Sequence, residues 1–301
     1  MKLKSKKAIK KPFEDRVFNA VTIGVVSFMT LIVLLPMMNI LASSFSEPSA
    51  VKMGKVLLLP VNFTLDNFKL ILEYKHIWTG YRNTIFYTVV GTLINVFLTM
   101  ICAYPLSVRS FSGRSVLNKV LFFTMIFNGG MIANYMLMRE LKLLNTIWAV
   151  LLPGAINVYN VMITRTYLQT SIPGELEEAA KIDGCNSFQY FIRFVLPLAK
   201  PIIAVISMYY AVAHWNSYFN AFLYLNERDM YPLQLFLREI LVNSQFQAGV
   251  VDDPEMLQAM MGVAETLKYV VIVVATAPLM LIYPFVQKHF VKGVMIGSVK
   301  G

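Results

Sequence analysis

Six long apolar stretches without any Asp, Glu, Lys or Arg constrain this chain more than any other feature of its sequence. Each is long enough to cross the roughly 30 Å hydrocarbon core of a bilayer as a helix. Helices buried in soluble proteins are rarely both so long and so free of charge. The sequence therefore predicts an all-α membrane protein with six transmembrane helices, formed by residues 17–41, 83–108, 120–138, 143–164, 201–226 and 269–287.

Composition and charge agree with this prediction. The chain is 57% hydrophobic and only 15% charged, whereas soluble domains carry roughly a quarter charged residues. With the N-terminus inside, most of its 27 Lys and Arg residues fall on the inner side, which is where basic residues concentrate in membrane proteins. We therefore expect a multi-pass protein of the cell membrane, with a membrane domain of residues 17–289 and cytoplasmic tails of residues 1–16 and 290–301. The first stretch is too long for a cleavable signal peptide.

The basic excess is a signal of topology and gives no indication of a nucleic-acid partner, although residues 1–11 can contact anionic lipid headgroups. Two cysteines, Cys102 and Cys185, do not make a disulfide framework, and the three histidines show no metal-ligand spacing. There is no G-x-x-x-x-G-K-[ST] loop to hold a nucleotide phosphate and no grouping of nucleophile and base. We expect a chain that is not an enzyme and holds no cofactor of its own.

A polar interruption at residues 171–201 predicts a short helix on the inner side. Pro173 suits a first helical turn, and Glu175, Glu177 and Glu178 follow where the helix dipole favours negative charge. Gly184 is a residue suited to leaving a helix. On these grounds alone, a solvated loop helix is favoured over a docking helix for a partner.

The same segment carries a motif. The permease subunits of binding-protein-dependent ABC importers have E-A-A, three residues, G, nine residues, I, one residue and L-P. Here Glu178, Ala179, Ala180, Gly184, Leu196 and Pro197 stand in that register, and Phe194 replaces the isoleucine. The chain resembles the carbohydrate-uptake branch of that family, of the type of the second permease of maltose transporters. The end of the chain, residues 291–301, is also similar to that branch.

The resemblance implies a type I ABC importer permease fold with a cytoplasmic coupling helix. It also implies a second homologous permease, an ATPase dimer that holds ATP and Mg, an extracellular sugar-binding protein and a saccharide substrate. The helix would lie in a groove of the ATPase, where both alanines are expected to pack. The residues implied in this coupling are Glu175, Glu178, Ala179, Ala180, Asp183, Gly184, Leu196 and Pro197.

The fifth stretch has the polar and aromatic residues expected of a sugar path. Asn216 and Asn220 are four apart and are expected to share a helix face. Amides are costly in hydrocarbon unless they are paired or face water, and sugars require amides together with flat aromatic faces. The alternative is hydrogen bonding between helices. The candidates are Trp215, Asn216, Tyr218 and Asn220, with Asn128 and Asn157 as weaker ones, whereas Asn95 is expected to join helices.

Outside the membrane, the resemblance implies that residues 243–262 reach toward the binding protein, with Gln245, Gln247 and Gly249 as contacts. An ordinary surface loop is an equal alternative. Further upstream, residues 65–72 are expected to form a short helix capped near Thr64 or Asp66.

Two other classes of function remain to be weighed. A self-contained secondary transporter would favour intramembrane carboxylates, and the six stretches contain none. A membrane-bound enzyme would require a catalytic grouping. The predicted function is the permease subunit of an ATP-driven importer, which moves oligosaccharides or polysaccharide fragments by alternating access.

Overall fold

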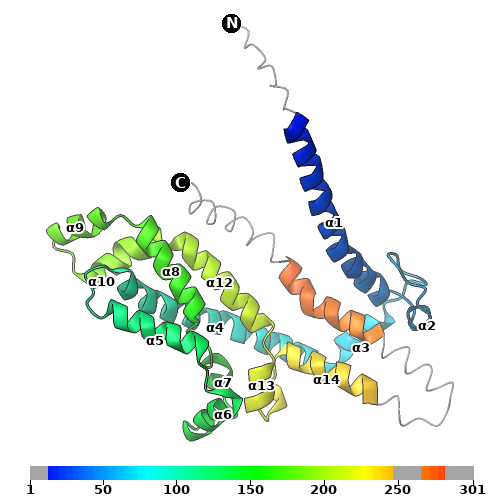
Figure 1. Cartoon of the computed structure of the whole chain (residues 1–301). Coiled ribbons are helices and arrows are strands. Elements are labelled where there is room, and N and C mark those ends of the chain that lie inside the picture. The colour runs from blue at the N-terminus through cyan, green and yellow to red at the C-terminus, as the bar shows by residue number, and fades with distance from the viewer. Residues whose placement is uncertain (1–12, 247–265, 282–301) are drawn as a thin grey trace. The chain divides into compact units, whose positions relative to one another are not determined.

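The computed structural model describes residues 13–246 and 266–281, which form helices and connecting loops (Figure 1). The chain divides into two compact units, residues 1–70 with 244–273 and residues 71–243 with 274–301. Most of both predicted tails, the end of the sixth predicted span and the positions of Gln247 and Gly249 lie outside the described residues.

The first unit contains α1 (Phe13–Ser44), α2 (Pro48–Lys52) and the start of α3 (Asp66–Glu73). Apolar side chains are exposed along most of α1, as expected of a helix that faces lipid. At its end, the Asn39 amide donates hydrogen bonds to the carbonyl oxygens of Val56 (3.0 Å) and Leu57 (2.8 Å). The helix predicted at residues 65–72 is confirmed as α3, whose first N–H, that of Asp66, donates to the hydroxyl of Thr64 (3.2 Å).

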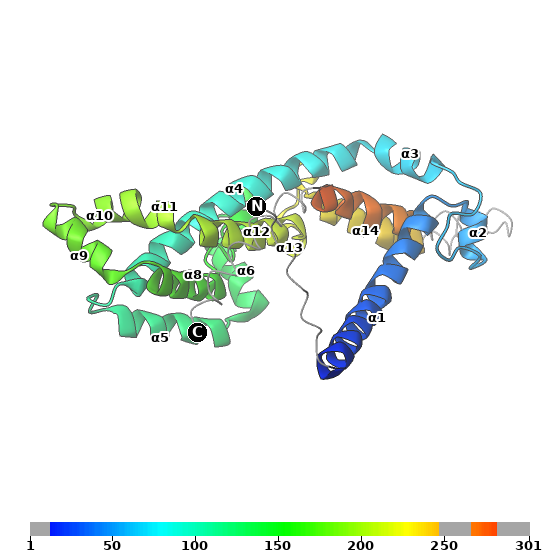
Figure 2. The ribbon, with the colours of Figure 1, turned by 90° about the horizontal axis from the view of Figure 1, so that it is seen from above.

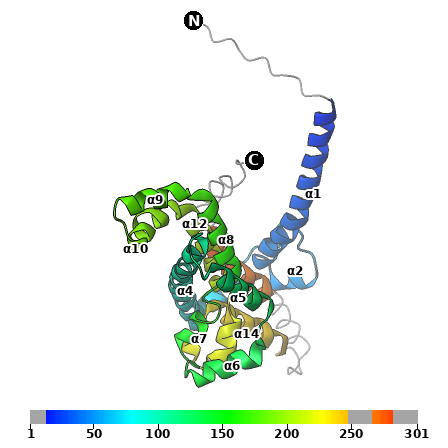
Figure 3. The same ribbon diagram turned by 60° about the vertical axis from the view of Figure 1, so that its left-hand side comes forward.

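The second unit is built on α4 (Lys75–Ser107), which packs against α8 (Val158–Ser171) and α12 (Lys200–Trp215). The short helices α9 (Gly174–Ile182) and α10 (Ser187–Tyr190) lie at one end of this unit, as Figures 1 and 2 show. Helices α6 and α7 lie toward the other end of this unit (Figure 3), and α13 packs against α7. The other helical elements are α5 (Arg114–Ile126), α6 (Gly130–Glu140), α7 (Ile147–Leu151), the π-helix Phe191–Val195, α11 (Leu196–Leu198), α13 (Phe219–Tyr224), the 3₁₀ turn Arg228–Met230, α14 (Leu233–Phe246) and Thr266–Leu281.

Three of the predicted spans are broken rather than continuous. The third bends by 113° between α5 and α6, where Gly130 has φ +79° and its N–H donates to the side chain of Asn128 (2.9 Å). The fourth divides into α7 and α8 around Pro153 and Gly154, whose φ is +78°. The fifth ends as α12 and resumes as α13. Glycine tolerates positive φ and proline removes a backbone donor, which explains the first two breaks.

Two described helices, α1 and α4, are long and apolar enough to cross a membrane unbroken. Two further helix pairs are bent: α5 with α6, and residues 187–198 with α12, the latter by 77°. If each bent pair counts as one span, the number of possible spans among the described residues rises to four. The described residues therefore differ from six uninterrupted spans, and the count of six stays a prediction.

A buried polar pair joins α4, α12 and the break in the fourth predicted span. Asn95 donates from its Nδ2 to the carbonyl oxygen of Ala155 (2.8 Å), while its Oδ1 lies 2.7 Å from Nε2 of His214. Because the amide nitrogen faces a carbonyl, Oδ1 must be the acceptor and His214 carries its hydrogen on Nε2. The ring lies so close to Gly91 that a Cβ there would collide with it.

A second pair repeats the arrangement one turn away on both helices. The hydroxyl of Tyr210 lies 2.8 Å from Oγ1 of Thr99 and accepts a hydrogen bond from the backbone N–H of Asn157 (3.2 Å). The contacts of Asn95 with Ala155 and His214 confirm the expectation that Asn95 joins helices. Both pairs satisfy backbone groups freed by the broken helix, which is how non-helical backbone is tolerated inside membrane proteins.

Candidate coupling site and substrate path

The polar interruption forms the short helix predicted for it, α9 (Gly174–Ile182). Pro173 precedes its first residue, and Glu175 and Glu177 occupy its first turn. Within the helix, Nζ of Lys181 lies 2.7 Å from Oε1 of Glu177, an i,i+4 ion pair. Both features favour helix formation locally, through the helix dipole and through the neighbouring side chains on one face.

Gly184 ends α9 in the way predicted. Its φ is +78°, a left-handed conformation that glycine adopts without steric cost. The Gly184 N–H donates to the carbonyl of Lys181 (3.0 Å) and the Cys185 N–H donates to that of Ala180 (2.9 Å). These two bonds make a Schellman motif, which leaves Asp183 exposed at the end of the helix.

The two faces of α9 have different surroundings. Leu176 and Ala180 are four residues apart and pack against the core between α4, α8 and α12, and Ala180 is only 4% exposed. The opposite face, at i, i+3 or i+4 and i+7 spacing, carries the exposed residues Glu175, Glu178, Ala179 and Ile182. Ile182 is 86% exposed.

This geometry corrects the expectation that both alanines pack in a groove of a partner. Ala180 faces the interior of its own chain and seats the helix on it, so Ala179 alone of the two lies on the outward face. The E-A-A pattern fixes small residues but does not indicate which chain each one contacts.

Two tyrosines form the wall on which α9 rests. A cavity beside Ala180 between Tyr104 and Tyr190 has a volume of only about 10 Å³, so the contact is close-packed. Burial and the nearby Glu177 carboxylate raise the pKa of Tyr190. Residue Tyr190 ends α10, whose start is fixed by a capping box between Asn186 and Gln189, a pattern that the sequence reasoning missed.

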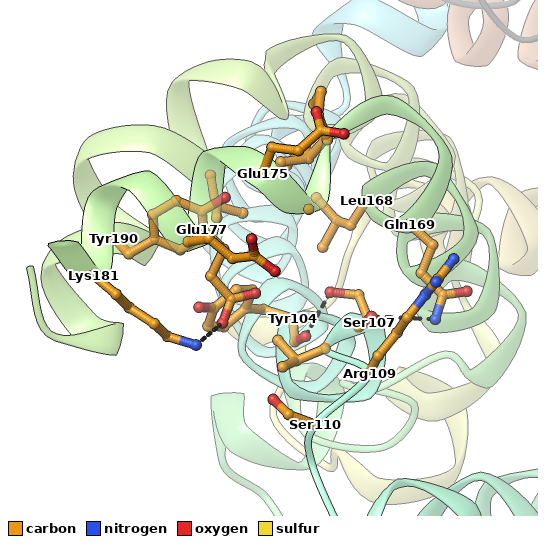
Figure 4. Close-up of a pocket in the computed structure, with 16 residues that line it drawn as sticks. Tyr104, Ser107, Arg109, Ser110, Leu168, Gln169, Glu175, Glu177, Lys181 and Tyr190 are labelled. Carbon is orange, nitrogen blue, oxygen red and sulfur yellow. Dashed lines mark hydrogen bonds and ion pairs between the residues drawn. The ribbon is translucent and has the colours of Figure 1, made fainter.

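A larger pocket of about 590 Å³ opens between α9 and the ends of α4 and α8 (Figure 4). Glu175, Glu177 and Glu178 line it on one side, and Arg109 lines it on the other. At its base, Nε2 of Gln169 donates to the carbonyl oxygen of Ser107 (3.3 Å). Arg109 and Gln169 were not predicted, because Arg109 comes from a distant loop and Gln169 from the preceding helix α8, both outside the motif.

Leu196 and Pro197, the last residues of the motif, lie in the turn between α9 and α12. Leu196 is half-buried against the same core, whereas Pro197 is exposed. Together with the π-helix Phe191–Val195, they form the element that meets α12 at 77°. The motif therefore extends from the outward face of α9 to the start of α12.

The fifth predicted span does not place its two amides on one helix face, which corrects that expectation. Asn216 caps the end of α12, where its Nδ2 donates to the carbonyl of Val212 (2.9 Å), and Asn220 lies in α13 beyond the break. Trp215 is buried and donates from Nε1 to the carbonyl of Ala275 (3.0 Å). Asn216 and Tyr218 are exposed.

The two weaker path candidates have local partners. Asn128 accepts from Gly130, as described above, and Asn157 caps α8 by accepting from the N–H of Asn160 (3.2 Å). Both side chains nevertheless belong to exposed residues at breaks in predicted spans. A role in the path stays a prediction for each.

Arg238, which was not predicted from the sequence, lies next to aromatic residues of the fifth predicted span. The guanidinium of Arg238, on α14, lies 5.6 Å from the ring centre of Tyr218 and 4.6 Å from that of Phe222. Cation–π contacts of this kind hold a cation beside aromatic faces. An ordinary surface loop was one of two equal alternatives for residues 243–262; in the described part of this segment, Gln245 belongs to helix α14.

Residues 77–296 match the family of binding-protein-dependent transport system inner membrane components. This match covers most of the chain, and the chain belongs to that family. The membership supports a transporter subunit that works with a binding protein and not the self-contained secondary transporter.

Curated relatives and a solved structure agree with the family. The chain is 42% identical over 288 residues to the polygalacturonan/rhamnogalacturonan transport system permease protein YtcP of Bacillus subtilis (strain 168), covering 96% of this chain and 100% of the relative. It is 41% identical to the protein LplC of the same organism, covering 95% of this chain and 96% of the relative. The solved structure of a bacterial ABC transporter involved in the import of the acidic polysaccharide alginate includes a chain that is 35% identical, with a TM-score of 0.81, and the match covers 94% of this chain and 100% of that chain.

Proposed function

We propose that this chain is the permease subunit of an ATP-driven importer that moves oligosaccharides or polysaccharide fragments delivered by an extracellular binding protein. The observation that carries the proposal is the seating of α9: one face is buried in the chain's own core, and the other exposes carboxylates, a small residue and Ile182. The relatives transport polygalacturonan or rhamnogalacturonan and alginate according to their descriptions, which supports a saccharide as substrate.

In this proposal α9 is the coupling helix. An ATPase subunit contacts the outward face, where Glu178 can pair with a basic residue, Ala179 admits a close approach and Ile182 supplies apolar area. Burial of Ala180 against Tyr190 and Val195 makes the helix move together with the core rather than independently. Because protein interiors are close-packed, a displacement of one buried element is transmitted to the elements packed against it.

The displacement reaches the membrane helices through α12. Ala199, Ile202 and Ile206 belong to the same buried cluster as Ala180, and α12 packs along α4. Closure of an ATPase dimer would then change the position of α12 relative to α4. This is a route for alternating access, with the breaks near Asn216 and Asn157 as the polar surfaces open to substrate.

The remaining partners and the topology belong to the same proposal. ATP and Mg bind to the separate ATPase subunit, and this chain performs no catalysis. A second homologous permease completes the path, the two termini lie in the cytoplasm, and α14 with the residues that follow it faces the binding protein.

The test is transport by the reconstituted system. The chain is co-expressed with its neighbouring permease, ATPase and binding-protein genes, purified and placed in vesicles that contain ATP. The proposal requires saccharide uptake that depends on both ATP and loaded binding protein. Uptake by the purified chain alone, driven by a proton or sodium gradient, would instead support the secondary transporter.

A further inference from the structure

A second pocket, which shares Arg109 with the one beside α9, is lined by four basic residues. It has a volume of about 640 Å³ and lies between the start of α5, the loop before it and α8. Arg109, Arg114, Lys119 and Arg165 line it together with Phe111, Ser112, Ser115, Asn118 and Phe122, and no Asp or Glu is among the lining residues. We call these lining residues the cationic pocket.

The excess of basic residues on the inner side accounts for the presence of all four basic residues, but it does not account for the fixed position of Arg165. This residue comes from α8, and it is positioned by two hydrogen bonds. Its Nε donates to the carbonyl of Leu106 (3.2 Å), and its Nη1 donates to Oδ1 of Asn118 (3.3 Å). Burial, and secondarily the charge of Arg114, lower the pKa of Arg165. Like charges therefore converge here without an acidic residue in the lining.

The position of the pocket on α5 indicates the kind of anion. The helix begins at Arg114 with no acidic residue in its first turn, so the positive end of its dipole adds to the field. Beyond that turn, α5 presents exposed apolar side chains, among them Val120, Phe123 and Ile126. Cations at the end of a helix whose sides are apolar and exposed lie at the level of lipid headgroups in an inner-membrane protein.

We infer that the cationic pocket binds the phosphate headgroup of an anionic membrane phospholipid. Several arginines and a lysine supply the charge, Ser112 and Ser115 supply hydroxyl donors, and Phe111 and Phe122 add apolar surface to the lining. Basic pockets between membrane helices are established as sites of this kind in other proteins. The occupant would tie the end of α4, α5 and α8 together beside the coupling region.

The experiment measures lipid binding to the full-length chain by native mass spectrometry, with phosphatidylglycerol and phosphatidylcholine of identical acyl chains as probes. The variant Arg114→Gln with Lys119→Gln removes two charges and leaves Arg165, which has structural contacts, in place. The control is Arg139→Gln with Lys142→Gln, an equal change of charge at two exposed residues outside the pocket lining. Arg114→Lys keeps the charge and guards against a folding artefact.

We expect the native chain to prefer phosphatidylglycerol, and the pocket variant to bind it roughly 10- to 30-fold more weakly, from about 1 kcal/mol per basic residue at an anionic surface. The control and Arg114→Lys should keep the preference. An unchanged preference in the pocket variant, or an equal loss in the control, would overturn the inference. So would displacement of the lipid by inorganic phosphate at low millimolar concentration, which would identify a site for the free anion, or loss of the lipid on assembly with partner subunits.

Discussion

Replacing the two adjacent alanines of α9 one at a time separates the two faces of this helix. The two changes are Ala180→Leu and Ala179→Leu, which add the same atoms to neighbouring positions. Leucine and alanine both favour helices, so the helix propensity of α9 changes little. Only the surroundings of each side chain differ, because Ala180 is 4% exposed whereas Ala179 is exposed.

The size of the effect at Ala180 follows from the space beside it. The adjoining cavity of about 10 Å³ holds about one water at most and cannot accept three additional carbons. Overfilling a packed site costs about 1–3 kcal/mol, which corresponds to roughly 5- to 150-fold in the equilibrium for opening of α9. At the exposed Ala179 the change is within about 0.5 kcal/mol.

Hydrogen exchange of the backbone amides of α9 in the purified chain measures this opening. Ala180→Leu should accelerate exchange by the factor given above, and Ala179→Leu should leave it nearly unchanged while lowering the amount of ATPase that co-purifies. Native-like protection in Ala180→Leu would refute the reasoning, because it would mean that α9 is not seated by this residue.

Three further outcomes are expected. Gly184→Val should weaken ATPase binding because left-handed backbone costs a non-glycine residue about 1–2 kcal/mol, whereas Gly184→Asn, which tolerates that conformation, should retain most of it; equal binding by both would contradict the role of this turn. Gly91→Ala should lower the melting temperature by displacing the ring of His214, whereas Gly24→Ala, where a Cβ meets nothing within 4 Å, should not; equal melting would argue against the close approach. Asn216→Leu should reduce saccharide uptake without reducing co-purification of the ATPase, and full uptake would remove Asn216 from the path.

Helix α9 and its ends were predictable because their determinants are local. Pro173, the acidic first turn and the glycine that leaves the helix act within a few residues of one another. The structure places the acidic turn and Gly184 as expected, and Pro173 one residue earlier, at the N-cap. The long apolar stretches without charged residues also indicated helices along much of the chain. The direction in which Ala180 points was not predictable, because it depends on burial in a cluster with residues distant in sequence, such as Ala103 of α4 and Leu168 of α8.

The breaks in the predicted spans had signals that were underestimated. Gly130 and Gly154 adopt positive φ, and an uncharged stretch that contains such a residue can be two helices as readily as one. The break at Asn216 contains no glycine or proline. It was therefore not predictable from the local sequence, and it lies beside Trp215, which is fixed by a hydrogen bond to the distant Ala275. Arg165 and Arg238 were missed for a related reason, since each reaches its aromatic or cationic neighbours from a distant part of the chain.

The most direct test of the account is cross-linking from α9 to the ATPase. In a chain with both native cysteines replaced, Ala179→Cys and Ala180→Cys are compared in the assembled transporter with a bifunctional thiol-to-amine reagent. The account predicts that the cysteine at position 179 forms a covalent adduct with the ATPase and that the cysteine at position 180 does not, because the latter is buried in its own chain. No adduct from position 179, or equal adducts from both positions, would contradict the claim that the outward face of α9 couples this permease to its ATPase.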